Sequence, residues 1–180
     1  MKRILPPLVL LLNGCPSVPE TFAPPEQRPP LPEFRPYRAT RVVHMSDPDA
    51  AAFLVRDIGG LEGGSWRWAG KRPTLRLRPR SDEGIRYVID FTLPPVTFKE
   101  TGPVTISFYF GDHLLESVRY AEAGRKQFQK LVPARWIATG EEVLVAAEID
   151  RLWKSKEDGS TLGFIITSMG LAKSSQEVRP

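Results

Sequence analysis

The residues best suited to contact a ligand are the four tryptophans of this 180-residue chain. An indole offers an apolar face on which the C–H face of a sugar can stack, together with one N–H donor. Trp153 follows the acidic end of a predicted strand, and Trp136 lies in a predicted loop. We therefore expect these two at a loop edge, as platforms for a sugar. Trp66 and Trp68 share one face of a predicted strand, where we expect them to pack in the core.

A row of arginines provides a second candidate for binding. Arg76, Arg78 and Arg80 alternate with apolar residues, so a strand here would direct all three to solvent. No carboxylate lies between Lys71 and Arg80, and guanidinium groups pair bidentately with phosphate or carboxylate. Arg76 and Arg78 are therefore candidates for contact with an anionic envelope polymer. The alternative is that these charges keep an edge strand from pairing with other chains.

The remaining polar residues do not match a catalytic template. His44 precedes the predicted core and His113 lies in a predicted hairpin turn, so neither is placed to orient a nucleophile. Glu148 and Asp150 share one strand face, but nothing sets them apart as the paired carboxylates of a glycosidase. One cysteine and two distant histidines exclude a zinc site. We predict no enzymatic activity, no metal and no cofactor.

The elements that must position these residues are strands. Hydrophobic residues recur with period two, which indicates half-buried strands, and turn residues separate the runs. The clearest strands are predicted over 74–78, 85–91, 103–110, 143–149 and 163–171, with weaker ones over 65–69, 114–120 and 127–132. About eight short strands separated by turns predict an all-β chain, a single jelly-roll-like β-sandwich.

One short N-terminal helix should precede the strands. Ser46 is followed by Asp47, Pro48 and Asp49, which favours a helix start over Ala50–Leu54, about two turns long. Gly59 and Gly60 should stop any extension, and the glycine-rich run 59–64 is predicted to be a flexible turn that enters a strand.

The first 15 residues have the pattern of a secretory signal. Lys2 and Arg3 precede a nine-residue apolar stretch that ends shortly before Cys15, the only cysteine. The residues Leu12, Gly14 and Cys15 match the bacterial lipobox, which directs lipid attachment to the cysteine. We therefore expect residues 1–14 to be removed and Cys15 to be lipidated, because two acyl chains anchor a protein stably.

The rest of the N-terminal part is expected to be a tether. Eight of the 21 residues in 16–36 are proline, which favours polyproline II over helix or sheet. The predicted organisation is a lipidated tether over 15–37, a β-sandwich over 38–172 and a disordered tail over 173–180. No run of 18 apolar residues predicts a membrane-spanning helix. The net charge of +4 falls to +2 without Lys2 and Arg3, too little for a nucleic-acid-binding protein.

Several short motifs resemble a bacterial extracytoplasmic β-sandwich family over roughly residues 48–171. They are Gly-Leu-Glu at 60–62, Trp-Arg-Trp at 66–68, Gly-Pro-Val-Thr at 102–105, Gly-Asp-His at 111–113 and Asp-Gly-Ser-Thr-Leu-Gly at 158–163. Ser160 stands where the family pattern has Arg. The resemblance implies a jelly roll like those of carbohydrate-binding modules. Such domains occur as exported lipoproteins and as appendages of bacterial glycosyltransferases.

Two functions follow as hypotheses. The first is a non-enzymatic lipoprotein, held extracytoplasmically at the cell envelope by its lipid anchor, whose β-sandwich binds glycan. The alternative is a structural or assembly subunit whose partner is a membrane protein complex of the envelope. An exposed tryptophan beside polar loops would favour the first, and a contiguous apolar patch on one sheet would favour the second.

Overall fold

A computed structural model describes residues 42–173 of the chain. The predictions for Cys15, for the leader over 1–14 and for the tether over 15–37 lie outside the described residues. The predicted tail begins one residue too early, because Lys173 still belongs to the last strand. Within residues 42–173, no helix is long and apolar enough to cross a bilayer.

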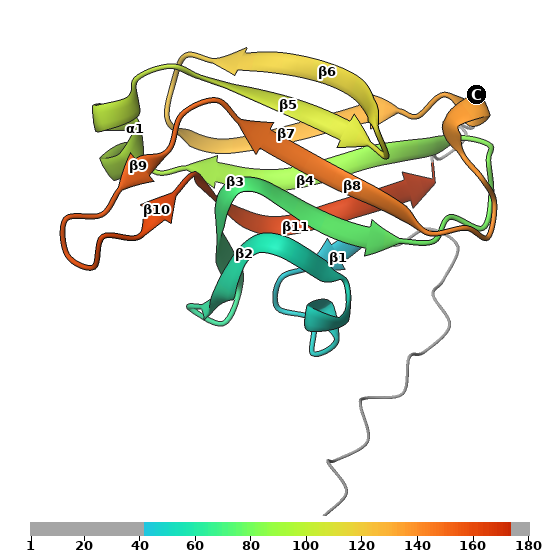
Figure 1. Cartoon of the computed structure of the whole chain (residues 1–180), viewed down its shortest axis with the longest axis horizontal. Helices are drawn as coiled ribbons and strands as arrows, with labels where there is room; N and C mark the ends of the chain where they lie inside the picture. The colour runs from blue at the N-terminus through green and yellow to red at the C-terminus, as the bar shows by residue number, and fades with distance from the viewer. Residues whose placement is uncertain (1–41, 174–180) are drawn as a thin grey trace, which may run out of the picture. The chain divides into compact units, whose positions relative to one another are not determined.

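The described residues form eleven strands, one α-helix and two 3-10 turns (Figure 1). The strands are β1 (Val42–His44), β2 (Leu54–Glu62), β3 (Trp66–Leu77), β4 (Ile85–Leu93), β5 (Val104–Phe110), β6 (His113–Tyr120), β7 (Gly124–Leu131), β8 (Val143–Ile149), β9 (Trp153–Lys154), β10 (Thr161–Leu162) and β11 (Phe164–Lys173). The helical elements are η1 (Ala50–Ala52), α1 (Pro95–Thr101) and η2 (Ala134–Trp136).

Nine strands form one antiparallel sheet that folds into two layers at β3. The strand order is β6-β5-β8-β3-β11-β4-β7, with β2 also paired to β3 and β1 to β11. The first part of β3 pairs with β11, as at Trp68 and Ile165, whereas its last part pairs with β8, as at Leu75 and Val145. We call β2, β8, β5 and β6 with the end of β3 the front sheet. The back sheet comprises β11, β4, β7 and β1 with the start of β3.

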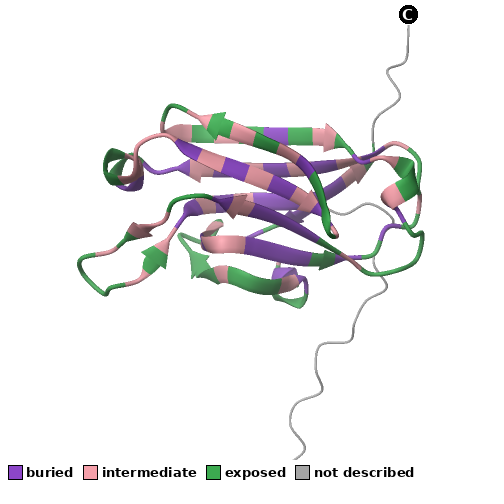
Figure 2. Ribbon diagram, turned by 45° about the horizontal axis from the view of Figure 1, so that its top comes forward, coloured by how far each residue is buried: buried purple, intermediate pink, exposed green. Residues whose placement is uncertain are grey.

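The core lies between the two sheets, which makes the fold a β-sandwich (Figure 2). Along β4 every second residue is buried, beginning with Ile85, because successive side chains of a strand point to opposite faces. Phe108 of the front sheet stacks on Phe128 of the back sheet, with ring centroids 3.7 Å apart. The Tyr87 hydroxyl donates a hydrogen bond across the core to the Ala146 carbonyl at 3.3 Å. Burial raises the pKa of Tyr87 well above its usual value.

The predicted fold class is confirmed, with corrections to single elements. Each of the eight predicted strands is present, and the runs 65–69 and 74–78 are parts of the single strand β3. The expected helix over Ala50–Leu54 is only one 3-10 turn, because Leu54 pairs with Leu75 and starts β2. The run 59–64 is not wholly a turn, since Gly59 and Gly60 belong to β2. The helix α1 was not predicted.

Candidate ligand-binding sites

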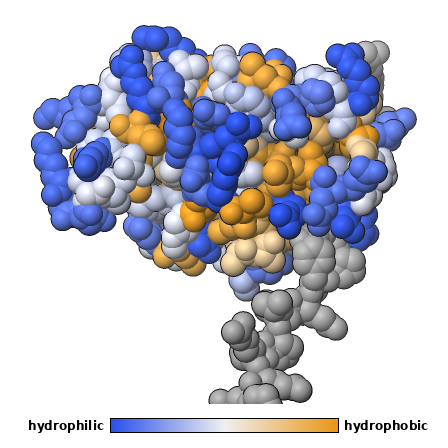
Figure 3. All heavy atoms as spheres, viewed as in Figure 1, coloured by the Kyte–Doolittle hydropathy of each residue, from blue (hydrophilic) through white to orange (hydrophobic). Residues whose placement is uncertain are grey.

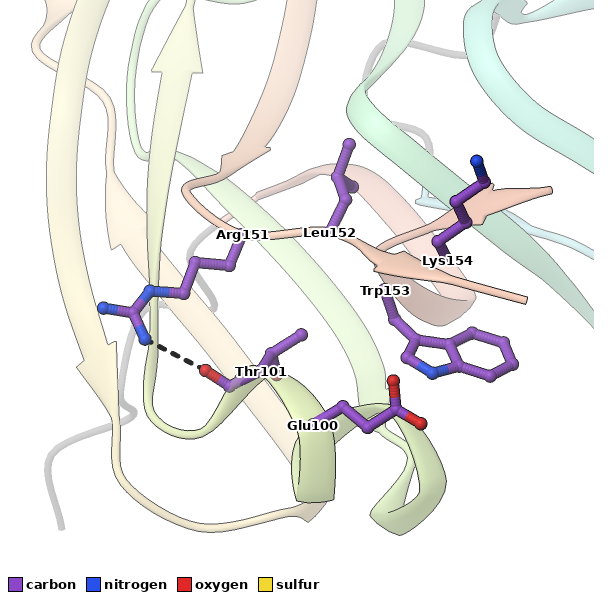
Figure 4. Close-up of a pocket in the computed structure, with 6 residues that line it drawn as sticks. All are labelled: Glu100, Thr101, Arg151, Leu152, Trp153 and Lys154. Atoms are coloured by element: carbon purple, nitrogen blue, oxygen red, sulfur yellow. Dashed lines mark hydrogen bonds between the residues drawn. The ribbon is translucent and has the colours of Figure 1, made fainter. Parts of the chain in front are cut away.

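Trp153 lies in an open cleft of about 410 Å³ between α1 and the β9–β10 hairpin. The cleft lies where β8 has ended and the chain passes the end of α1 (Figure 4). Six residues line it, namely Glu100, Thr101, Arg151, Leu152, Trp153 and Lys154. Trp153 does lie beside polar groups, but it belongs to the short strand β9 and not to a loop edge as predicted, and its binding role stays a prediction.

The Trp153 indole combines an accessible surface with an unsatisfied donor. The residue is half-buried, but its Nε1 atom is buried and has no hydrogen-bond acceptor within the described residues. A buried donor without a partner costs about 1–3 kcal/mol. Because the atom is buried, the ring must shift before an oxygen atom of a ligand or a water molecule can remove that cost.

Polar side chains of both signs line the cleft, and of those drawn in Figure 4 Glu100 extends toward the indole. Arg151 donates from its NH1 group to the Thr101 carbonyl at 3.0 Å, which ties the segment between β8 and β9 to the end of α1 (Figure 4). Glu100 lies on the other side and extends toward the indole (Figure 4). Its Oε1 atom is 3.8 Å from Lys156 Nζ, whose side chain is 85% exposed. The cleft thus offers both donors and acceptors beside an aromatic surface.

The hairpin that carries Trp153 is held by its turn. Trp153 pairs with Leu162 across the two short strands. Asp158 Oδ1 accepts hydrogen bonds from the Ser160 backbone N–H at 3.0 Å and from the Ser160 hydroxyl at 2.8 Å. These bonds, chiefly the one from the backbone of Ser160, with a further one from Ser155, lower the pKa of Asp158 to about 2. Ser160 therefore has a local role in closing this turn.

Trp136 does not join Trp153. It lies in η2 and stacks on His113 at the start of β6, with ring centroids 4.5 Å apart and planes inclined by 14°. Its other neighbour is Arg135, whose guanidinium carbon is 5.9 Å from the ring centroid. In Figure 1 this end of the sandwich is opposite α1 and β9. The two predicted sugar platforms are therefore separate surfaces, and one face of Trp136 is already occupied.

The arginines of the predicted row do not all lie on one strand. Arg76 and Arg78 are exposed, but both lie near one carboxylate, since Glu142 is 3.7 Å from Arg76 Nε and 3.4 Å from Arg78 NH2. Only Arg76 is in β3, which ends at Leu77. The alternative role as edge protection is wrong for this segment, because β3 pairs with β8 on one side and β2 on the other.

The tryptophans expected in the core are at the surface. Trp66 and Trp68 are half-buried and do not belong to the buried core. Their rings meet edge to face, with centroids 5.9 Å apart. The start of β3 faces outward here, because Trp68 is level with Ile165 and not with the buried Ile166. The prediction of a core position was wrong because period two alone does not say which face is buried.

The carboxylates considered for catalysis have structural partners. Glu148 Oε2 is 3.3 Å from Arg72 NH1, and Asp150 Oδ1 accepts a hydrogen bond from the Thr105 backbone N–H at 2.8 Å. Both contacts fasten neighbouring strands. Within residues 42–173, no three His, Cys, Asp or Glu side chains gather as a metal site would require.

Comparisons with known proteins yield remote structural likeness only. No protein-family model and no curated protein sequence matches the chain. One similar structure is the 4-O-methyl-α-glucuronidase BtGH115A of family GH115, with specificity for decorated arabinogalactans. Its TM-score is 0.46 at 11% identity, over 78% of this chain and 18% of that chain. Another is a CBM35 from Paenibacillus barcinonensis, with a TM-score of 0.40 at 13% identity, over 74% of this chain and 99% of that one. This chain therefore spans less than a fifth of the glucuronidase, and the expected family stays a prediction.

Proposed function

We propose that this chain is a non-enzymatic envelope lipoprotein that binds a saccharide in the Trp153 cleft. The observation that carries the proposal is the half-buried indole whose N–H has no acceptor, in an open cleft with Glu100, Arg151 and Lys154. A sugar ring requires an apolar face to stack on and several hydroxyl partners. The indole supplies the face, its N–H and the two cations supply donors, and Glu100 supplies an acceptor.

The test compares the two tryptophans that were singled out from the sequence. Trp153→Ala should weaken saccharide binding at least tenfold, or about 1.4 kcal/mol, measured by calorimetry with a ligand first found on a glycan array. Trp136→Ala is the matched control, because it removes the same side chain at the other end of the sandwich. Equal affinity in the two variants would show that the cleft is not the binding site.

The anchoring part of the proposal is tested separately. Cys15 is the only cysteine and ends a charged and then apolar leader. Cys15→Ser should move the protein from the membrane fraction to the soluble fraction, without changing saccharide affinity. Membrane association that persists in this variant would refute lipid anchoring while leaving the binding site intact.

The alternative function, docking on a membrane protein complex, has one observation in its favour. Leu144 of β8 is 43% exposed, and the front sheet presents a hydrophobic patch beside hydrophilic side chains (Figure 3). Apolar patches of a few hundred Å² are common on monomeric proteins. The cleft, with its unpaired donor, is the more specific feature, and we place saccharide binding first.

A further inference from the structure

A second hollow, of about 380 Å³, lies on the outer face of the front sheet. Thr74 of β3 and Ala146 of β8 are level with each other, and both line the hollow. Both residues are buried, but they lie on the strand face opposite to Leu75 and Val145, which belong to the core cluster between the sheets. Nine residues line the hollow, namely Arg56, Arg72, Thr74, Gly111, Asp112, Glu142, Val143, Leu144 and Ala146.

Arg72 is held firmly in the wall of this hollow. Its guanidinium carbon is 4.3 Å from the ring centroid of Tyr109, a cation–π arrangement. Its NH1 group contacts Glu148 Oε2 at 3.3 Å, and its backbone N–H donates to Asp57 Oδ2 at 2.8 Å. The Arg72 Nε atom is buried and has no acceptor within the described residues. The guanidinium is thus positioned by two neighbours while part of its donor capacity remains unused.

Arg56 of β2 provides a second guanidinium, and it has more free donors. Its Nε donates to the Thr74 hydroxyl at 3.3 Å, and that hydroxyl donates in turn to the Arg72 carbonyl at 2.8 Å. Among residues 42–173, no carboxylate forms an ion pair with Arg56. Because a guanidinium has five N–H groups, the bond to Thr74 orients Arg56 and leaves its two terminal nitrogens available.

The acidic groups of this face are mostly engaged elsewhere. Glu148 is paired with Arg72, and Glu142 lies close to both Arg76 and Arg78. Asp112 lies at the rim, in the turn between β5 and β6. Arg56 is therefore the cation of the hollow with no ionic partner in the described part of the chain.

We propose that this hollow binds an anionic group, a carboxylate or a phosphate carried by a polysaccharide, through Arg56 and Arg72. Carboxylate and phosphate oxygens match the paired N–H groups of a guanidinium, and such charge-assisted bonds are about twice as strong as neutral ones. The exposed Leu144 at the rim gives the sugar carbons an apolar wall. The proposal does not depend on the Trp153 cleft, which lies beyond the other end of β8.

The test uses the whole chain and three polymers that differ in charge: dextran, carboxymethyl-dextran and phosphorylated dextran. We expect one or both anionic polymers to bind at low salt, more weakly as salt rises, and plain dextran to bind at least tenfold more weakly. The anionic polymer that binds more tightly identifies the group as carboxylate or phosphate. Equal binding of all three polymers, or binding of none, would overturn the proposal.

Matched variants locate the site. Arg56→Gln should reduce affinity for the anionic polymer at least tenfold, and Arg56→Lys should restore it only in part, because an ammonium lacks the guanidinium fork. Arg125→Gln on β7 removes an exposed arginine from the back sheet and should leave affinity unchanged. If Arg56→Gln and Arg125→Gln lost the same affinity for the anionic polymer, the effect would come from the overall charge of the protein, and the proposed site would be refuted. Trp153→Ala should leave the affinity for the anionic polymer unchanged. A loss of affinity in this variant would place the anion in the Trp153 cleft and would also refute the proposed site.

Discussion

At the scale of single residues, Asp158 is the carboxylate that the fold most clearly keeps ionised. Its pKa is lowered from 3.8 to about 2, mainly by the Ser160 backbone N–H and then by the hydroxyls of Ser155 and Ser160. A carboxyl with a lower pKa in the folded state stabilises that state above its unfolded pKa. The turn that supports Trp153 is therefore held at pH 4 and above, and loosens as the pH falls toward 2.

Replacing the Ser160 hydroxyl tests this account. Ser160→Ala removes one of the donors, so the pKa of Asp158 should rise toward 3.8, and the pH range in which the turn loosens should move upward with it. A carboxyl titration by NMR measures the pKa directly. Ser81→Ala, in another turn on the surface, is the control. An unchanged Asp158 pKa in Ser160→Ala would show that the Ser160 hydroxyl does not contribute and that the backbone N–H and Ser155 hold the carboxylate.

At the scale of elements, one glycine sets how closely the β9–β10 hairpin approaches the sandwich. The Gly163 backbone N–H donates to the Ala69 carbonyl at 2.7 Å. A Cβ atom at Gly163 would lie 2.8 Å from the Gly70 carbonyl oxygen and 3.1 Å from Ile149. No side chain fits at position 163 without moving the backbone of β3. This steric limit explains why the 158–163 motif ends in glycine.

This close approach predicts the effect of the smallest possible side chain. Gly163→Ala should lower the free energy of unfolding by about 1–3 kcal/mol, as overpacking usually does, measured by urea unfolding. Gly60→Ala in β2 is the matched control, because a Cβ there meets nothing within 4 Å. If both variants were equally stable, β3 would have room to shift at this point.

Strands whose residues alternate between buried and more exposed could be predicted from the sequence. Strands without this alternation could not. Ile85–Leu93 alternates strictly between buried and half-buried residues, and period two identified it. In β2 seven of the nine residues are exposed, and its pairing with β3 shifts register three times, so the strand has no periodic signal. The helix α1 starts after Pro94, has no side-chain cap and is seven residues long. A helix this short, of which only Thr97 is buried, has little periodic signal in the sequence.

The candidate sites show the same limit. Trp153 was identified by its residue type and its place after a strand. Glu100 and Thr101, which complete its cleft, precede it by about 50 residues, and only the fold brings them together. The sequence indicates the hollow on the front sheet less clearly. Arg72 and Thr74 precede Arg76 at intervals of two residues, so they share its outward face of β3. Arg56, however, belongs to β2, which has no periodic signal.

At the scale of the whole molecule, aromatic contacts across the core hold the two sheets together. Phe108 stacks on Phe128 and also contacts Phe91 and Tyr87, both of which lie in β4 of the back sheet. Phe108 is fully buried. Removing a ring from such a position leaves a cavity. It also loses the favourable free energy of transferring the ring from water to the core.

Phe108→Ala should therefore lower the free energy of unfolding by about 3–5 kcal/mol, with one cooperative transition in urea monitored by both fluorescence and circular dichroism. Phe98→Ala, in the half-buried part of α1, should cost clearly less. Separate transitions for the two probes in the wild-type chain would show that the sandwich does not unfold as one cooperative unit.

β11 follows every other strand of the described residues along the chain, yet it lies between β3 and β4 in the sheet and also pairs with β1. Until it leaves the ribosome, β4 lacks one neighbour and the back sheet has no link to β3. Premature pairing of such open edges leads to aggregation. The two sheets thus cannot be joined through β11 until residues 164–173 have been synthesised, which leaves an interval in which a chaperone can bind the unfolded chain.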